Sequence, residues 1–268
     1  MTIKLTEWNK YIRRLRMLND KAVQEFTAFI VRNGGIEMIE RSALIDYAYA
    51  LSMKYGEASA ALSAEMYDAV ALLQGVTVPA AIPAETAAYS EVAKTVNGII
   101  KKTGSQEIVA QSVGLLVKDA GQKTTIQNAR RDKAEIAFIS SGDTCAFCIM
   151  MAGKGWRRAS ASDMDKDGEP AHLHANCDCT YAVRFSKNLD YSGYEPEKYK
   201  EIYDNAPLED GQRATAKNKL NAMRREFYAQ NKDEINEQKR SAYEKRKERE
   251  SSEAEEMNVN YRDSKRVV

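Results

Sequence analysis

All the cysteines and histidines of this chain, four and two respectively, lie between Cys145 and Cys179. That window holds only 35 of the 268 residues, so chance alone would rarely gather all six there. The cluster begins with a C-x2-C pair and ends, after 23 intervening residues, in the order H-x-H-x-x-C-x-C. A C-x2-C turn presents two thiolates to one metal ion, and a later element supplies the other ligands. The pattern predicts a tetrahedral zinc site.

Zinc takes four ligands, and the cluster offers more than four candidates. Cys145, Cys148 and His174 are the first three predicted ligands. The fourth is Cys177 or Cys179, because a C-x-C pair seldom turns both sulfurs onto one metal ion. A site with every position filled by protein is typical of structural zinc.

Two other roles for the cysteines are less well supported. The first residues lack the charged, apolar and small-residue order of a signal peptide, so a disulfide is not expected. A redox C-x2-C requires a βαβ setting, which the residues before Cys145 do not provide.

A calcium loop and a catalytic metal are two further alternatives. Asp163, Asp165, Asp167 and Gly168 match the opening of a calcium loop, but His174 stands where its glutamate belongs. A solvated acidic turn is therefore the preferred interpretation.

Catalysis by the metal is also not expected. The chain has no H-E-x-x-H motif and no deaminase motif. A nuclease of the HNH type would need a further histidine as general base, and only His172 is left for that role. We therefore expect no enzyme, with a metal-dependent nuclease or DNA-processing factor as the alternative.

The first third of the chain has the apolar periodicity of helices. Apolar residues recur at spacings of three and four over residues 6–33, and further helices are predicted over 36–55 and 58–73. They form a predicted N-terminal helical bundle, residues 1–75. Two prolines then predict a linker at residues 76–83.

The rest of the chain divides into three predicted parts. Residues 84–133 form a second helical region, with helices over 85–100, 106–120 and 124–132. Short β-branched and aromatic runs at 134–140 and 180–185 predict strands that flank the cysteines, so residues 134–186 form a small α+β zinc-binding module. The fold class is therefore mainly α. Residues 187–268 are a polar helical extension and tail.

A long polar helix is predicted at residues 212–250. It carries twelve Lys or Arg residues against seven Asp or Glu residues, a local excess of five. Such a helix either contacts packaged DNA through phosphates or is simply solvated, with ion pairs along its surface. The whole chain has a net charge of only +1, and no run of about 18 apolar residues predicts a membrane helix.

Three blocks of the sequence resemble a known family. Residues 125–132, 141–153 and 174–179, with the strand at 180–185, are similar to tailed-phage minor head proteins related to the F protein of phage Mu. Such proteins combine a helical region, a C-x2-C segment and an H-x-x-C-x-C segment followed by a strand. The similarity covers residues 85–186. The acidic insert between the two cysteine groups and the polar extension after Asn188 depart from this pattern.

The resemblance implies a structural role in a virion. Proteins of this kind are made in the bacterial host cytoplasm and lie in the phage head, often near the portal and in few copies. They act in head assembly, or in DNA packaging or delivery. The implied partners are the portal protein, the major capsid protein or both, with packaged DNA as a further partner of residues 212–250.

Overall fold

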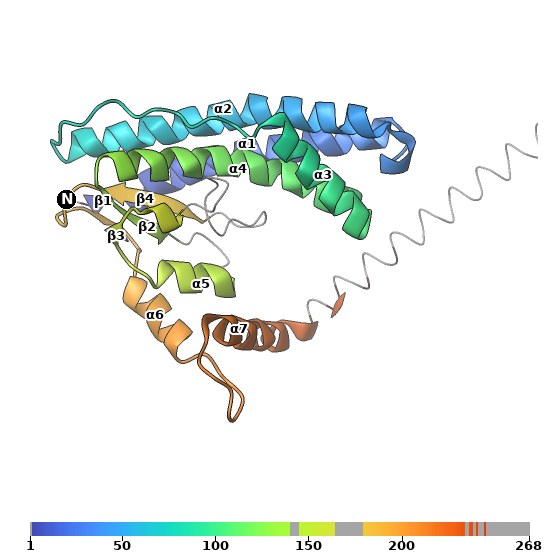
Figure 1. Cartoon of the computed structure of the whole chain (residues 1–268). Coiled ribbons are helices and arrows are strands. Elements are labelled where there is room, and N and C mark those ends of the chain that lie inside the picture. Colours follow the sequence, from blue (N-terminus) through green and yellow to red (C-terminus); the bar gives the residue numbers. More distant parts are fainter. Residues whose placement is uncertain are drawn as a thin grey trace, which may run out of the picture. The chain divides into compact units, whose positions relative to one another are not determined.

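The computed structural model describes residues 2–139, 145–163 and 179–233, together with residues 236, 237, 240 and 244. The chain divides into two compact units, residues 1–203 and residues 204–268. The first unit is mainly helical, as predicted, and carries a small sheet (Figure 1).

Three long helices form the body of the first unit (Figure 1). They are α1 (Leu5–Arg32), α2 (Arg41–Leu73) and α4 (Gln106–Arg131), and each packs against the other two. A shorter helix, α3 (Tyr89–Thr103), packs on α2 and α4. The apolar stripe predicted for the first helix is confirmed, because Trp8, Phe26 and Ile30 are fully or almost fully buried.

Two predicted helix breaks do not occur. The helices predicted to separate at Gly56 are one helix, α2, and those predicted to separate after residue 120 are one helix, α4. A glycine lies in each of the two gaps between the predicted helices, and the structure uses both glycines for close packing. A Cβ on Gly56 would lie 2.8 Å from Thr86 Cγ2, and one on Gly121 would lie 2.5 Å from Ser59 Oγ. Residues 36–38 form only a short 3₁₀ turn.

Residues 76–83 contain no helix or strand, and side chains from two helices hold them in place. Asn128 of α4 donates to the carbonyl of Ile82 and accepts from its amide, each at 2.9 Å. Thr124 Oγ1 accepts from the Ala84 amide at 2.9 Å, and Asp68 accepts from the Ala81 amide at 2.8 Å. Since the helices on both sides pack together, this segment joins parts of one unit.

The sheet lies at one side of the long helices (Figure 1). Both predicted strands are confirmed as β2 (Glu135–Ile139) and β4 (Thr180–Arg184), which pair antiparallel. A two-residue strand, β3 (Arg157–Arg158), adds to the other edge of β2. The remaining elements of this unit are α5 (Ala146–Ala152), η2 (Ala161–Asp163), α6 (Pro196–Asp204), and the parallel pair β1 (Thr2–Ile3) and β5 (Asp190–Tyr191).

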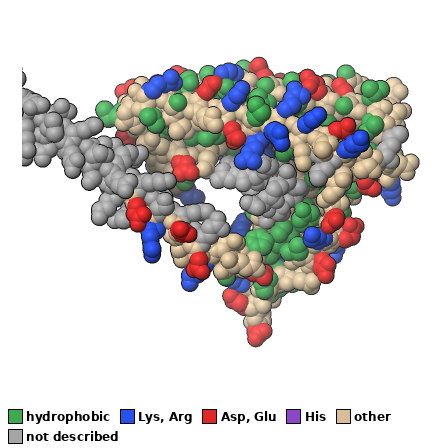
Figure 2. Space-filling view, turned by 180° about the vertical axis from the view of Figure 1, so that it is seen from behind, with side chains coloured by type: hydrophobic (Ala, Val, Ile, Leu, Met, Phe, Trp, Pro, Cys, Tyr) green, Lys and Arg blue, Asp and Glu red, His purple; other side chains and the backbone are tan. Residues whose placement is uncertain are grey.

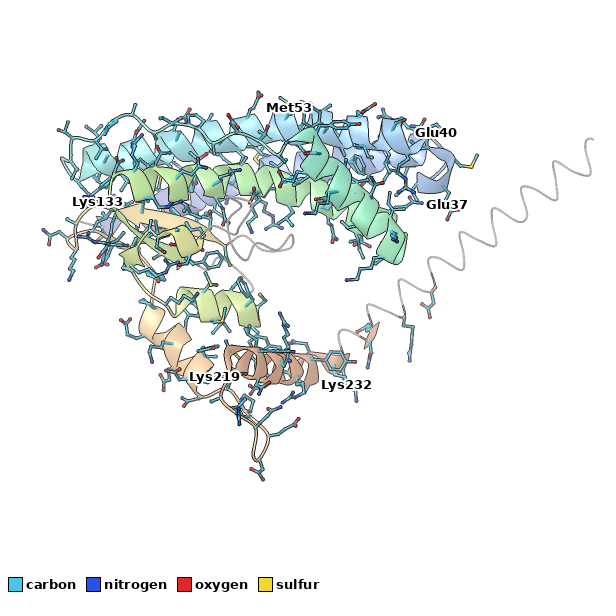
Figure 3. All side chains as sticks on the ribbon, in the orientation of Figure 1. Glu37, Glu40, Met53, Lys133, Lys219 and Lys232 are labelled. Atoms are coloured by element: carbon cyan, nitrogen blue, oxygen red, sulfur yellow. The ribbon has the colours of Figure 1, made fainter. Side chains whose placement is uncertain are left out.

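The second unit contains α7 (Ala216–Gln230), which carries Lys219, with Lys232 just beyond its end (Figure 3). Thr215 caps this helix, because its hydroxyl accepts from the Asn218 amide at 3.2 Å. Lys219 makes an ion pair with Asp204 at 3.3 Å. The long polar helix predicted for 212–250 is thus described only in its first part, and most of its second half lies outside the described residues.

Candidate metal centre

The strand pairing places the end of β2 and the start of β4 at the same end of the sheet. β2 ends at Ile139, β4 begins at Thr180, and these two residues are paired partners. The chain leaves β2 toward Cys145, whereas Cys179 immediately precedes β4. Cys179 is therefore adjacent to the residue that pairs with the last residue of β2, although 40 residues separate the two strands in sequence.

An aromatic pair stabilises this end of the ladder. Phe138 and Tyr181 are paired across the strands, and their rings meet edge to face with centroids 5.2 Å apart. Such a pair contributes about 0.5–1.5 kcal/mol beyond its burial. At the other end of the ladder Arg184 bonds Glu135 at 2.7 Å and stacks on the Trp156 ring at 4.5 Å. The register of the β2–β4 pair is thus held at both ends.

Helix α5 positions the first two predicted ligands. Cys145 is its N-cap residue, with extended backbone angles, and Cys148 lies in the first turn. The Cys148 amide donates to Cys145 Sγ at 3.5 Å. Both predicted ligands therefore lie at the N-terminal end of one short helix.

The distance between the two sulfurs fits a shared metal ion. Cys145 Sγ and Cys148 Sγ are 3.5 Å apart. Two thiolates bound to one tetrahedral zinc ion at about 2.3 Å stand about 3.8 Å apart, whereas bonded disulfide sulfurs are about 2.05 Å apart. The pair is therefore close to the geometry of two zinc ligands and far from that of a disulfide.

The remaining predicted ligands are only partly described. Cys179 is buried, and its backbone carbonyl accepts a hydrogen bond of 3.2 Å from the Gln122 side chain of α4. His174 and Cys177, like His172, lie outside the described residues. Within the described parts of the chain, no three His, Cys, Asp or Glu side chains form a group that could hold a metal ion.

A comparison with protein families identifies the family of this chain. The family model described as "VG15 protein" matches residues 2–206. The chain belongs to the VG15 protein family. This is a family of phage proteins, so the phage origin that the sequence implied is confirmed, while the closer resemblance to minor head proteins stays a prediction. A search of curated proteins and a search of solved structures found no match to this VG15-family chain.

The VG15 match includes the acidic segment that resembles a calcium loop, and its first residue has another role. Asp163 is almost fully buried and holds the guanidinium of Arg157 with both carboxylate oxygens. It also accepts from the amide and the hydroxyl of Ser160, at 2.8 and 3.1 Å. These contacts occupy the carboxylate, so Asp163 belongs neither to a solvated turn nor to a cation site. Asp165, Asp167 and Gly168 lie outside the described residues.

The buried ion pair has a direct effect on the acidity of Asp163. Burial alone would raise the pKa of this carboxyl, but the hydrogen bonds from Arg157 and Ser160 outweigh burial and hold the pKa below its ordinary value. The sequence analysis missed the pair because Arg157 and Asp163 lie in two different short elements, β3 and η2, and no periodic pattern links them. In the described part of this VG15-family protein, no helix is long and apolar enough to cross a membrane.

Proposed function

We propose that this VG15-family protein is a structural minor head protein of a tailed phage, with one zinc ion stapling residues 134–186. The observation that carries the proposal is the Cys145–Cys148 pair, with sulfurs 3.5 Å apart at the start of α5. The pair lies in the segment that resembles minor head proteins, and the family is a phage family. The two facts together favour a zinc-stapled virion component.

The zinc ion would be held by Cys145, Cys148, His174 and either Cys177 or Cys179. When bound, it supplies a cross-link and charge neutralisation for the thiolates, and its binding free energy adds directly to folding. The chain's own part is to present two sulfurs from the N-terminus of α5 and to bring the start of β4 to the same end of the sheet. In this proposal the module has a structural role and no turnover.

Portal protein, major capsid protein or both are the proposed protein partners. Large apolar side chains are exposed near the two ends of α2: Met38 is 75% exposed and Leu72 82% exposed. Such side chains lose unfavourable hydration when a partner covers them. Packaged DNA is a further proposed partner of residues 212–250. The continuously described part of that segment, residues 212–233, carries six Lys or Arg residues against two acidic residues.

The experiment is to fractionate phage particles and detect the protein in heads, in complex with portal or capsid protein. The purified protein is also incubated with DNA and zinc, magnesium or manganese. We expect the protein in head particles and intact DNA. Metal-dependent cleavage that disappears with His172→Ala would instead assign the protein to the nucleases, and absence from head particles would refute the structural role.

A further inference from the structure

Four cations share one exposed face of α1. The first is Lys10, and the others lie three, four and eleven residues after it: Arg13, Arg14 and Lys21. At 3.6 residues per turn, these spacings place all four on the same side of the helix. All four side chains are exposed. The opposite side of the helix is the buried one that forms the core. We call these four residues the α1 stripe.

A counter-charge lies near one end of the α1 stripe, because the charge of Lys21 contributes to lowering the pKa of the Glu25 carboxyl. None of the stripe's members makes an ion pair with another described residue, whereas nearby Arg16 pairs with Asp20 at 3.6 Å. From residue 4 to residue 21 the chain has six cations and two carboxylates, an excess of four, although its total net charge is +1. The remainder of the chain is therefore net negative by three. Positive charge is concentrated here well beyond the average of the chain.

The acidic residues of the α1–α2 connection lie away from the α1 stripe. The connection from α1 to α2, which carries Glu37 and Glu40, lies at the other end of the long helices from Lys133 (Figure 3). The stripe lies in the first two thirds of α1, away from that connection. Figure 2 shows Lys and Arg side chains spread along the face of the long helices, with acidic side chains among them. Like charges three and four residues apart destabilise a helix by a few tenths of a kcal/mol per pair, and an anionic partner would remove that cost.

The dimensions of the stripe suit a nucleic-acid backbone. Lys10 and Lys21 are eleven residues apart, or about 16 Å along the helix axis. One DNA strand presents a phosphate about every 3.4 Å along its axis, so this length spans about five phosphates. A straight row of cations on a convex helix contacts phosphates without reading bases.

A protein partner fits the stripe less well. The cores of protein interfaces are depleted of charge and enriched in aromatic residues. On this face the stripe encloses only Met17 as an exposed large apolar side chain, and the aromatic residues Trp8 and Tyr11 are buried.

We propose that the α1 stripe is a DNA-backbone contact surface of this protein, independent of base sequence. The proposal rests on the proposed function, in which the protein works beside packaged DNA. It adds a second DNA surface, formed by well-packed helix, to the one proposed for residues 212–250.

The test measures the binding of a short duplex DNA to the full-length protein as a function of salt concentration. If all four cations engage phosphates, they contribute about 3.6 to the slope of log K against log salt. Arg13→Gln with Arg14→Gln should therefore reduce that slope by about 2. Glutamine keeps the helix propensity of arginine, so α1 should remain folded. A second duplex of unrelated sequence should bind equally well.

The matched control is Lys101→Gln with Lys102→Gln, which removes the same charge from exposed positions of α3. It should leave the slope nearly unchanged. The proposal would be overturned if the two double variants changed the slope equally, or if neither changed it. It would also be overturned if DNA binding depended on α7 alone and disappeared with Arg224→Gln and Arg225→Gln. Displacement of DNA by an acidic polypeptide at lower concentration than by DNA itself would assign the stripe to a protein partner. This assay needs no phage particle, so its failure is distinct from absence of the protein from heads.

Discussion

Gly153 ends the helix that carries the cysteine pair, and it leaves no room for a side chain. A Cβ at this position would lie 2.8 Å from the Lys200 amide nitrogen, 3.0 Å from Lys200 Cα and 3.1 Å from the Tyr199 carbonyl carbon. All three atoms belong to the backbone of α6, so no side-chain rotation can relieve the contact. Gly153→Ala must push the two segments apart by several tenths of an ångström. Overpacking of this kind costs about 1–3 kcal/mol.

The matched control is Gly98→Ala in α3, where an added Cβ meets nothing within 4 Å. Alanine in a helix interior is favoured over glycine by about 1 kcal/mol, so this variant should be more stable than the wild type. One kcal/mol shifts the melting temperature by roughly 2–4 °C in a protein of this size. We expect Gly153→Ala to melt about 2–12 °C lower and Gly98→Ala about 2–4 °C higher, as measured by circular dichroism. A Gly153→Ala protein that melts at or above the wild-type temperature would refute the close approach of α5 and α6.

Three further predictions concern the metal centre and its ion pair. Untagged, freshly reduced protein should contain one zinc per chain by elemental analysis, and Cys145→Ser or Cys148→Ser should make residues 134–185 sensitive to protease. A metal-free protein, or a cysteine variant with the wild-type melting temperature, would contradict the zinc cross-link. His172→Ala should leave the zinc content and the melting temperature unchanged, and loss of zinc would make this residue a ligand. Because the pKa of Asp163 is depressed in the folded state, its contribution to stability is full above the unfolded pKa and is lost as pH falls through the folded pKa. The wild-type melting temperature should therefore fall more steeply below about pH 4 than that of Asp163→Asn; parallel curves would contradict the ion pair.

Helix positions could be predicted from the sequence because burial imposes a period of three to four residues, and α1 follows the prediction closely. The same periodicity could not show whether the helices break or continue at Gly56 and after residue 120. Glycine either ends a helix or lets a neighbour approach, and the choice depends on Thr86 and Ser59, which are distant in sequence. Two-residue strands such as β1 and β3 are too short to show any alternation.

In the candidate site, too, contacts within one short segment could be predicted from the sequence, and contacts between different elements could not. The C-x2-C spacing predicted two sulfurs within reach of one metal ion, and the Cys145–Cys148 distance agrees with it. No local pattern indicated that Asp163 is bound by Arg157, or that Gln122 of α4 bonds the backbone of Cys179. Those contacts depend on which elements the fold brings side by side, and therefore need the structure.

The size of the sheet explains why a metal staple would matter in this protein. β2 and β4 are only five residues long, and β3 adds two more residues at the edge. Sheets this small are marginal without a covering layer or a cross-link. Packing on α4 covers part of this one, yet 40 residues lie between β2 and β4, and the two residues of β3 are the part of them that pairs with β2. Closing a loop of that length has an entropic cost that four metal bonds at its base would offset, because they tie both ends together where they leave the sheet.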